Sequence, residues 1–327
     1  MPLLLAAAVL VAASLCAYIF FQVRHERIPG AGDALHSGVT LTYQGEERRV
    51  RPYIHTLLLL GIDQFSEADT AEESGWNFSF AAPRNNTQAD FIALLVFDLK
   101  ARTVTPIQLN RDTMCNVPYL SLNGNVLGTQ FEQLALAHNA GSGKEDSCRY
   151  VAAVVSDLLM GARVDHFLSL NMDAVPLVND MVGGVTLTMD EDYISESANG
   201  LSLHKGDVVE LKGADALSFL RMRRHDRVDA NAARMGRHRL YLDAFAKQAK
   251  AASRQNPDLI ADSFDELTPY MFTDLDLNSY SDHLYWLSYF DILPVQSPEG
   301  DYRMGQEWAE FYPDEASLWQ LLKAAFT

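Results

Sequence analysis

Three short apolar runs between residues 54 and 109 dominate the hydrophobic pattern of the first part of the chain. They read IHTLLLLGI, DFIALLVFD and TVTPIQL, and turn-forming residues bound them. Continuous apolar runs of this length are typical of strands that are buried on both faces of a sheet. We therefore predict three central strands. The polar residues between the first two, 64–88, are expected to form a long loop, and loops of that length in a compact domain are usually functional.

From residue 131 onward, helical and strand-like patterns alternate. Apolar residues spaced three and four positions apart predict helices at residues 131–141, 147–161, 172–184, 213–223 and 233–252. Short apolar runs predict strands at residues 167–172 and 185–189. The spacing in the tail, at residues 279–290 and 300–326, predicts further helices that are integrated into the fold. Strands interleaved with helices indicate an α/β protein, with a mixed central sheet that is covered on both faces.

An uncharged apolar segment begins the chain. Residues 2–21 are twenty residues without a charge, which is about the length that crosses a ~30 Å hydrocarbon layer as a helix. We interpret residues 1–28 as an N-terminal transmembrane anchor. The alternative is a cleaved signal peptide, but no basic residue precedes the apolar run and no clear A-x-A site follows it. Arg24 and Arg27 follow the segment, and the positive-inside rule would then leave the body of the protein in the cytoplasm.

The rest of the chain divides into a linker and one folded domain. Residues 29–52 are punctuated by Gly and Pro, and we expect them to form a linker with a small hairpin. The folded domain is predicted to span residues 53–327. Its core motifs lie in residues 53–250, and a helical part follows in residues 251–327.

Charge and cysteine content limit the function classes. The 327 residues include 26 Lys or Arg and 43 Asp or Glu, so the formal net charge is −17. This balance argues against non-specific binding to nucleic acid, which needs a broad basic surface, and any anion site must therefore be local. Three Cys residues cannot make a disulfide framework. A Cys115–Cys148 bridge would suit an extracytoplasmic domain, and two unrelated reduced thiols are the alternative.

Polar residues stand at the ends of the three predicted central strands. Asp63 ends the first strand, Asp90 opens the second, and Arg111 with Asp112 ends the third. Such positions in an α/β sheet point into the crevice where these folds bind ligands. Mg²⁺ typically takes one or two protein carboxylates and completes its shell with water and phosphate oxygens. The two aspartates, Asp63 and Asp90, are therefore a candidate Mg²⁺ site, although each taken singly is more often a turn or cap residue.

A dense arginine cluster is the second chemical signal. Seven of the 26 basic residues fall within nineteen positions: Arg221, Arg223, Arg224, Arg227, Arg234, Arg237 and Arg239. Guanidinium groups bind phosphate through paired hydrogen bonds and remain charged, so several of them around one pocket form a pyrophosphate site. Arg234 and Arg237 are one helical turn apart and share a helix face. The alternative is a solvated basic helix that pairs with the surplus Asp and Glu.

Taken in order, these segments resemble a known family. LLLLGID, QADFIALLVFD, NRDTM, VDHFLSLNMDAVPLVNDMVGGVTL, GADALSFLRMRRHD and RMGRH are similar to the successive motifs of the LytR-CpsA-Psr family, across roughly residues 53 to 250. The resemblance implies a three-layer α/β/α fold with a long apolar groove for a polyprenyl chain. It also implies a phosphotransferase that moves a cell-wall glycopolymer from polyprenyl pyrophosphate onto a hydroxyl of N-acetylmuramic acid in peptidoglycan. The implied location is the cell membrane, with a single span and an extracytoplasmic catalytic domain. This orientation is opposite to the one that the positive-inside rule gives for Arg24 and Arg27.

The resemblance also assigns roles to individual residues. The residues implied to be catalytic are Arg111, Asp112, Arg221 and Arg223. The residues implied to bind pyrophosphate are Arg111, Arg221, Arg223, Arg234, Arg237 and Gln88. The residues implied to be associated with Mg²⁺, the expected cofactor, are Asp63 and Asp90.

Two positions depart from the family pattern. Gln88 stands where many members have Arg, so a pyrophosphate contact is missing or Arg84 supplies it, and His238 stands where members often have Gln. Asp112 and Asp229 are both candidates for the general base, and the sequence does not choose between them.

Two rival functions stay open at the level of sequence. A hydrolase would use the same arginines and Mg²⁺, with water as the attacking group, and would be a polyprenyl-pyrophosphate phosphatase. A non-catalytic module would bind the lipid-linked carrier or wall polymer, or act as a regulator. A product assay with and without a peptidoglycan acceptor separates transfer from hydrolysis.

Overall fold

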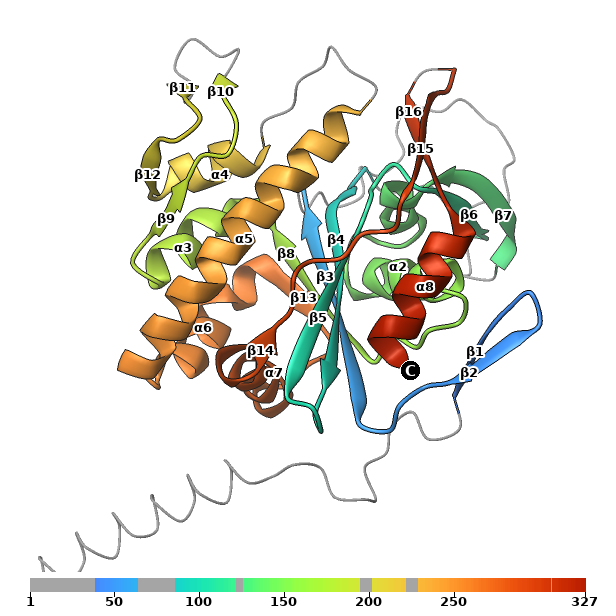
Figure 1. Cartoon of the computed structure of the whole chain (residues 1–327), viewed down its shortest axis with the longest axis horizontal. Coiled ribbons are helices and arrows are strands. Elements are labelled where there is room, and N and C mark those ends of the chain that lie inside the picture. Colours follow the sequence, from blue (N-terminus) through green and yellow to red (C-terminus); the bar gives the residue numbers. More distant parts are fainter. Residues whose placement is uncertain (1–38, 64–85, 122–125, 195–201, 222–228, 307) are drawn as a thin grey trace, which may run out of the picture.

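A six-stranded mixed sheet forms the centre of the computed structural model (Figure 1). The structure describes residues 39–63, 86–121, 126–194, 202–221, 229–306 and 308–327. The strand order is β13-β8-β3-β4-β5-β14. The strands are β3 (Ile54–Ile62), β4 (Ala89–Asp98), β5 (Thr103–Leu109), β8 (His166–Asn171), β13 (Met271–Thr273) and β14 (Asp291–Ile292). The predicted α/β class and its mixed central sheet are confirmed.

The three apolar runs form the adjacent strands β3, β4 and β5, as predicted. β4 lies between β3 and β5 and is antiparallel to both, while β8 pairs in parallel with β3 on its other side. Nearly every residue of β4 from Ile92 onward is buried. Such continuous burial arises because this strand is covered on both faces, which is why its sequence reads as an apolar run and not as an alternation.

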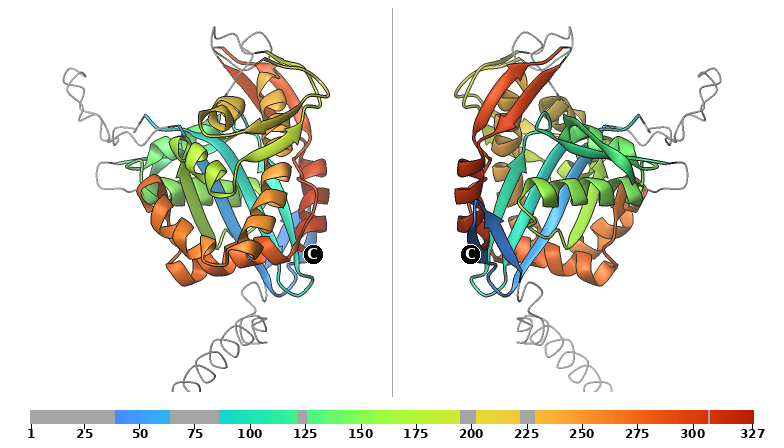
Figure 2. Two further views of the ribbon diagram at one scale, coloured as in Figure 1. Left: turned by 90° about the vertical axis from the view of Figure 1, so that its left-hand side faces the viewer. Right: turned by 90° about the vertical axis from the view of Figure 1, so that its right-hand side faces the viewer.

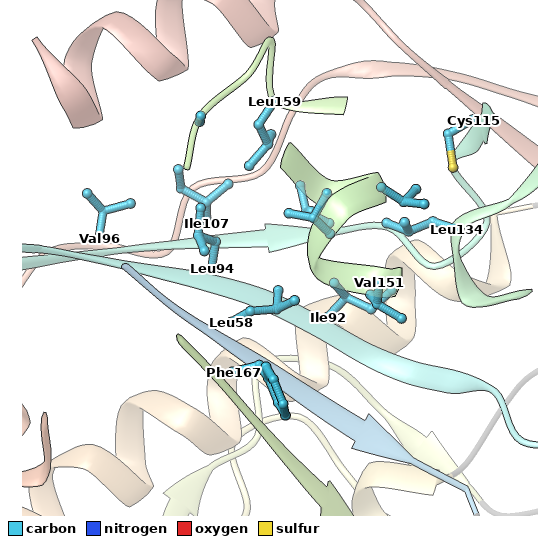
Figure 3. Close-up of a cluster of buried hydrophobic side chains, with 14 of the residues drawn as sticks. Leu58, Ile92, Leu94, Val96, Ile107, Cys115, Leu134, Val151, Leu159 and Phe167 are labelled. Carbon is cyan, nitrogen blue, oxygen red and sulfur yellow. The ribbon is translucent and has the colours of Figure 1, made fainter. Parts of the chain in front are cut away.

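Successive residues of the central strands serve two different cores. Leu58, Ile92 and Phe167 pack on one face with α2 (Glu145–Leu158), η1 (Leu134–Ala140) and α8 (Glu315–Phe326). Figure 3 shows this cluster, which includes Val151 of α2 and Ile92 of β4. Leu57, Leu95 and Leu168 point to the opposite face, because side chains alternate along a strand.

Helices cover that opposite face as well. They are α3 (Val175–Met181), α5 (Ala230–Gln255), α6 (Leu259–Leu267) and α7 (Leu277–Tyr289). Figure 2 shows the sheet between the two groups of helices. A third apolar cluster lies beyond α3. It is built from the long helix α5, from α4 (Ala214–Arg221), and from the small strands β9 (Val185–Thr188), β10 (Tyr193–Ile194), β11 (Ser202–Leu203) and β12 (Val208–Leu211).

The tail differs from the prediction. Residues 300–326 were expected to be helical throughout, but only α8 at their end is a helix. The first part forms an antiparallel hairpin of β15 (Gly300–Met304) and β16 (Ala309–Pro313). In Figures 1 and 2 this hairpin projects past the end of the sheet at which β3 ends.

The segment at residues 131–141 also differs from the predicted helix. Its start belongs to β7 (Val126–Gln133), which pairs antiparallel with β6 (Met114–Leu120), and only the short 3-10 turn η1 follows. The segment has apolar residues at helical spacing, but Leu134, Ala135 and Ala137 are buried by contact with the sheet and not by an extended helical face.

The predicted linker contains part of the folded body. β1 (Thr40–Tyr43) and β2 (Glu46–Arg49) form the expected small hairpin. Leu41 and Val50 belong to the same core as α8, and Trp319 Nε1 donates a hydrogen bond to Glu46 at 2.7 Å. The folded body therefore begins before residue 53.

Cys115 and Cys148 are free thiols in the structure. Both are buried in the core around α2, and burial raises the pKa of each thiol to about 12. The possible bridge is not formed. The predicted anchor, residues 1–28, lies outside the described residues, and no helix within the described ranges has the length and apolar character to cross a membrane.

Candidate functional site

The strand directions bring the predicted polar residues to one edge of the sheet. β3 and β8 run parallel, so Ile62 and Asn171 pair at their ends. The antiparallel β4 begins at the same edge, where Ala89 pairs with Ile62. Residues that follow β3, β8 and β5, and residues that open β4, therefore lie close together. This is the edge at which α/β sheets commonly bind ligands.

Asp90 lies at the centre of this edge, between two arginines. The Arg111 guanidinium forms an ion pair with Asp90 Oδ1, and Arg234 Nη1 lies 3.5 Å from Oδ2. Arg234 Nη2 also donates to the main-chain carbonyl of Asp90 at 3.1 Å. Side-chain exposure is 9% for Arg111 and 2% for Arg234, so these charges interact with little screening by water.

Gln88 and Asp63 extend this network along the edge. Gln88 Oε1 accepts a hydrogen bond from Arg111 Nη2 at 2.6 Å, and its backbone N–H donates to Asp63 Oδ1 at 3.0 Å. Gln88, which replaces the usual family arginine, thus holds Arg111 in place. Arg84, the suggested substitute, lies outside the described residues.

Arg221 is the exposed arginine of the described site. Its Nη2 donates to the Asp63 carbonyl at 3.4 Å and to Asp173 Oδ1 at 3.1 Å. The Arg221 side chain is 42% exposed, in contrast to the buried Arg111 and Arg234. It stands at the C-terminal end of α4, where a ligand from solvent can reach it. Its predicted companion Arg223 lies outside the described residues.

The inward stripe of α5 explains how Arg234 reaches the sheet. The buried residues of this helix are Asn231, Arg234, Met235, Arg237, His238 and Tyr241. Their spacing is that of a core-facing helix stripe, yet its first two turns carry polar and charged groups where apolar ones are usual. Arg234 Nε donates to Asn231 Oδ1 at 3.1 Å, and Asn231 Nδ2 donates to Asn110 Oδ1 at 2.6 Å.

Arg237 has a different environment from Arg234. Its guanidinium lies 4.7 Å from the ring centroid of Tyr193 in a cation–π arrangement. Arg237 is buried. Tyr193 comes from the small strand β10, and its ring packs against Phe219 of α4, so Arg237 connects α5 with this part of the fold.

His238 joins α5 to the end of α4. Its Nε2 lies 3.0 Å from the carbonyl oxygen of Leu220, the residue before Arg221. Burial, reinforced by the positive charge of Arg234, lowers the pKa of His238 to about 3. The ring is therefore neutral at neutral pH. Its edge packs against Phe91, with 5.6 Å between ring centroids.

Asp112 lies at the far end of the site from Arg221. Asp112 Oδ1 is 3.6 Å from Arg111 Nε and accepts a hydrogen bond from Gln133 Nε2 at 3.3 Å. Asn110 Oδ1 also accepts from the Asp112 backbone N–H at 2.9 Å. Asp229, the other candidate base, directly precedes α5.

Several residues of the network were missed by sequence reasoning. Tyr302 of β15 accepts a hydrogen bond from Asn110 Nδ2 at 2.5 Å, and burial followed by the Asp112 charge raises the Tyr302 pKa to about 12. Asn110 directly precedes Arg111, and Asn231 stands one helical turn before Arg234. Their positions relative to these predicted site arginines could therefore have identified both residues from the sequence. Gln133, Asp173 and Tyr302 come from distant segments and had none.

The balance of carboxylate and guanidinium charges in the described site is relevant to the prediction that Mg²⁺ binds there. The carboxylates of Asp90 and Asp112 face the guanidinium groups of Arg111 and Arg234, and Asp173 pairs with Arg221. The described side chains therefore have no surplus of positive charge for a pyrophosphate. No cluster of three or more His, Cys, Asp or Glu that could hold a metal is found among them. One or two carboxylates suffice for Mg²⁺ when phosphate supplies the other ligands, so the expected Mg²⁺ at Asp63 and Asp90 stays a prediction.

The chain is similar to known proteins of one family. A model described as the LytR_cpsA_psr family matches residues 48–295. The polyisoprenyl-teichoic acid–peptidoglycan teichoic acid transferase TagU of Halalkalibacterium halodurans is 32% identical over 116 residues, which is 35% of this chain and 36% of TagU. The cell wall biosynthesis protein LcpA of Corynebacterium glutamicum is 25% identical over 265 residues, which is 75% of this chain and 50% of LcpA. The matches thus span half or less of these relatives.

Solved structures show the same fold. The B. subtilis TagV crystal structure superimposes with a TM-score of 0.61 at 20% identity and covers 83% of this chain and 95% of TagV. TagT bound to LI-WTA gives a TM-score of 0.59 at 19% identity and covers 83% of this chain and 89% of TagT. The protein gbs0355 from Streptococcus agalactiae gives 0.65 at 21% identity, covering 83% of this chain and 86% of that one.

Proposed function

The chain belongs to the LytR-CpsA-Psr family, and from this premise we propose that it is a phosphotransferase of the cell wall. It moves a glycopolymer from a polyprenyl-pyrophosphate carrier onto a hydroxyl of peptidoglycan. The observation that carries the proposal is the convergence of Arg111 and Arg234 on Asp90, at the edge that also holds Asp63 and Arg221. The name of the relative TagU, which combines a polyisoprenyl carrier, teichoic acid and peptidoglycan, supports the substrate classes.

The arginines suit the pyrophosphate of the carrier. Arg111 and Arg234 are buried and fixed in direction, while Arg221 is exposed at the rim. Fixed guanidinium groups stabilise charge that develops on phosphate oxygens at little reorganisation cost. We assign Arg221 to the first contact with the pyrophosphate, and Arg111 and Arg234 to the charge that builds up during transfer. Arg223 is assigned to the same anion from its place in the sequence.

Mg²⁺ is part of the proposal because the arginines alone are balanced by carboxylates. Asp63 and Asp90 would hold the ion. When bound, it would neutralise phosphate oxygens and polarise the phosphorus for attack. Because Arg111 and Arg234 both contact Asp90, a bound ion would compete with the two arginines for this carboxylate.

The proposed step conserves atoms and charge. The acceptor hydroxyl oxygen forms a bond to the phosphorus that bears the glycopolymer, and the anhydride P–O bond breaks. Polyprenyl phosphate leaves with the electron pair of that bond. Asp112 is placed to take the hydroxyl proton, because it lies beside Arg111 and is held by Gln133. The buried arginines position the reacting groups and stabilise the charge.

Partly exposed residues on the sheet face that carries Leu57 and Leu168 support the proposal of an apolar groove for the polyprenyl chain. Gly61 pairs with Phe91 on one side and with Leu170 on the other, so the three share a face. All three are partly exposed, although Leu57 and Leu168 farther along the same face are buried. The helix cover therefore loosens next to Asp63 and Asp90, where the lipid end of a bound carrier would lie.

The location follows from the acceptor. Peptidoglycan is outside the cytoplasmic membrane, so the catalytic domain must be extracytoplasmic to reach it. We propose that residues 1–28 anchor the protein in that membrane as a single span. This orientation places the site on the side of the membrane where both the flipped carrier and the acceptor are present.

Carrier binding and product analysis test the proposal. The full-length protein, purified in detergent, should retain a polyprenyl phosphate that mass spectrometry detects. An Arg111→Ala/Arg234→Ala variant should retain much less, whereas Arg163→Ala, at the opposite end of the sheet, should match the wild type. Release of free glycopolymer phosphate with water as the acceptor, and no attachment to added peptidoglycan, would instead show a phosphatase.

A further inference from the structure

The β15–β16 hairpin directly contacts the residues at the sheet edge where the proposed site lies. The Phe311 backbone N–H in β16 donates to the Asp112 carbonyl at 2.8 Å, and Gln133 Nε2 in β7 donates to the Ala309 carbonyl at 2.7 Å. The same Gln133 amide donates to Asp112 Oδ1. The β15–β16 and β6–β7 hairpins are therefore tied together at the residue that we assign as the base.

The two faces of the β15–β16 hairpin have different surroundings. Tyr302 pairs with Phe311 on one face, their rings 5.0 Å apart, and this face turns inward toward Asn110. Asp301 pairs with Tyr312 on the other face, where the Arg303 guanidinium lies 4.6 Å from the Tyr312 ring centroid. The inward face supports the catalytic edge, so the outward face is available to another molecule.

Exposed aromatic side chains gather on this outward side. Phe131 of β7 is 58% exposed, and its ring centroid is 6.4 Å from that of Tyr312. Trp308, in the turn between β15 and β16, is 71% exposed. Large apolar side chains that gather at one place on a surface mark an interaction site. We call Phe131, Tyr312 and Trp308 the aromatic platform.

The aromatic platform leads toward Asp112. Phe131 and Gln133 alternate along β7, so they lie on one face roughly 7 Å apart. Trp308 is four residues from Tyr312, or roughly 13 Å if the chain between them is fully extended. A ligand that contacts both Trp308 and Tyr312 is therefore extended, and its inner end comes close to the Asp112–Gln133 pair.

Charge determines which extended ligand fits. Beside Tyr312 is a hollow of about 470 Å³, lined in part by Glu299, Asp301, Arg303, Asp314 and Glu315. Four carboxylates against one guanidinium repel an anionic polymer, nucleic acid or an anionic membrane. Aromatic faces beside carboxylate and amide groups suit a chain of uncharged pyranose rings, which present C–H faces for stacking and hydroxyls for hydrogen bonding.

We propose that the aromatic platform is the acceptor subsite, and that it binds a glycan strand of uncharged sugar rings with one hydroxyl directed at Asp112. The acceptor role rests on the proposed function, whereas the binding of a glycan strand does not. The anionic donor polymer then occupies the opposite side of the site, next to Arg221. The two substrates thus approach Asp112 and Asp90 from separate surfaces.

Binding to a purified glycan strand tests the proposal. The full-length protein in detergent is titrated by calorimetry with the tetrasaccharide of N-acetylglucosamine, whose pyranose rings carry no charge. A Phe131→Ala/Trp308→Ala variant should bind at least about tenfold more weakly, because two stacking contacts are lost. A Val208→Ala/Tyr289→Ala variant, which removes equally exposed apolar side chains from β12 and α7, should bind like the wild type. Both variants should keep the wild-type melting temperature.

Three outcomes separate the possibilities. Equal affinity of the platform variant and the wild type would overturn the proposal. So would a platform variant that loses binding to phosphatidylcholine vesicles while it keeps glycan affinity, because the platform would then be a membrane contact. If the wild type binds the glycan through the platform but transfers nothing, the phosphotransferase assignment fails and the glycan site stands. Carrier retention, measured by mass spectrometry, should be unchanged in the platform variant.

Discussion

Arg234 of α5 contacts Asp90 of β4 through both the side chain and the main chain of the aspartate. Arg234 Nη1 lies 3.5 Å from Oδ2, and Nη2 donates to the carbonyl oxygen at 3.1 Å. The two residues are 144 positions apart, and Arg234 is almost completely buried. This contact fastens the long helix to the sheet edge and fixes one of the arginines that we assign to phosphate.

Replacing Arg234 by Met should destabilise the fold. The variant leaves Asp90 with Arg111 as its remaining arginine partner in the described site, and removing one member of a buried ion pair costs about 3 kcal/mol. Urea denaturation should show this loss in the free energy of unfolding. A single variant as stable as the wild type would show that the contact is not maintained in solution.

Replacing Arg221 by Ala should reduce lipid binding without destabilising the fold. Its ion pair with Asp173 is exposed, and such pairs contribute about 0–1 kcal/mol, so the melting temperature should barely change. Retention of polyprenyl phosphate should nevertheless fall roughly tenfold or more, since a charged contact to phosphate is lost. Arg48→Ala is the matched control, because Arg48 also forms an exposed ion pair with a carboxylate, that of Glu46. Equal losses of lipid in both variants would remove Arg221 from the site.

Pyrophosphate binding should depend on Mg²⁺. Carboxylates offset the arginines of the described site, so an added divalent cation is needed to give the site a positive surplus. Calorimetry with inorganic pyrophosphate should show at least about tenfold tighter binding when Mg²⁺ replaces EDTA. An Asp63→Asn/Asp90→Asn variant should lose most of this difference. Affinity that is equal with and without the ion in the wild type would exclude the metal from the proposal.

His283 should make stability fall as the pH drops below neutral. Burial lowers its pKa from 6.5 to about 4, with the nearby His166 acting in the same direction. The unfolded chain therefore binds a proton more readily, so stability is complete above about pH 6.5 and declines toward pH 4. At about pH 5 the loss from this residue is about 2 kcal/mol.

A His283→Leu variant should therefore show a shallower decline in the free energy of unfolding between about pH 7.5 and about pH 5. The exposed His204 provides the control, and His204→Leu should keep the wild-type slope. The same slope in the His283 variant as in the wild type would mean that this ring is not buried neutral. His138 and His238, whose pKa values burial also lowers, account for part of the remaining decline.

The sequence was sufficient for β3, β4, β5 and β8 and for much of the ligand edge, whereas β13 and β14 lie in the part, residues 251–327, that was predicted to be helical. The strands β3, β4 and β5 could be recognised in the sequence because strands that are buried on both faces have continuous apolar runs and no alternation of apolar and polar residues. Asp63, Asp90 and Arg111 stand directly at the ends of those strands, so their meeting followed from strand direction. Arg234 was identified by its residue type, but its deep burial on α5 was not, because a buried charge looks like a surface charge in the sequence.

The hairpins could not be predicted for a physical reason. Residues 300–313 are short and mix apolar and polar side chains, so helix and strand periodicities fit them about equally well. What decides their conformation is tertiary contact: Tyr302 with Asn110, and Phe311 with the Asp112 main chain. Those partners are distant in the chain, and the aromatic platform depends on the same contacts. The sequence therefore revealed the phosphate side of the site more fully than the acceptor side.

Attachment of a lipid-linked glycopolymer to purified peptidoglycan tests the central claim most directly. The full-length protein with Mg²⁺ should yield glycopolymer bound to peptidoglycan through a phosphodiester, together with an equal amount of polyprenyl phosphate. An Arg111→Ala variant should form at least about a hundredfold less of both products, because it lacks the guanidinium between Asp90 and Asp112. Wild-type rates in that variant, or wild-type protein that releases the polymer without attaching it, would contradict the assignment.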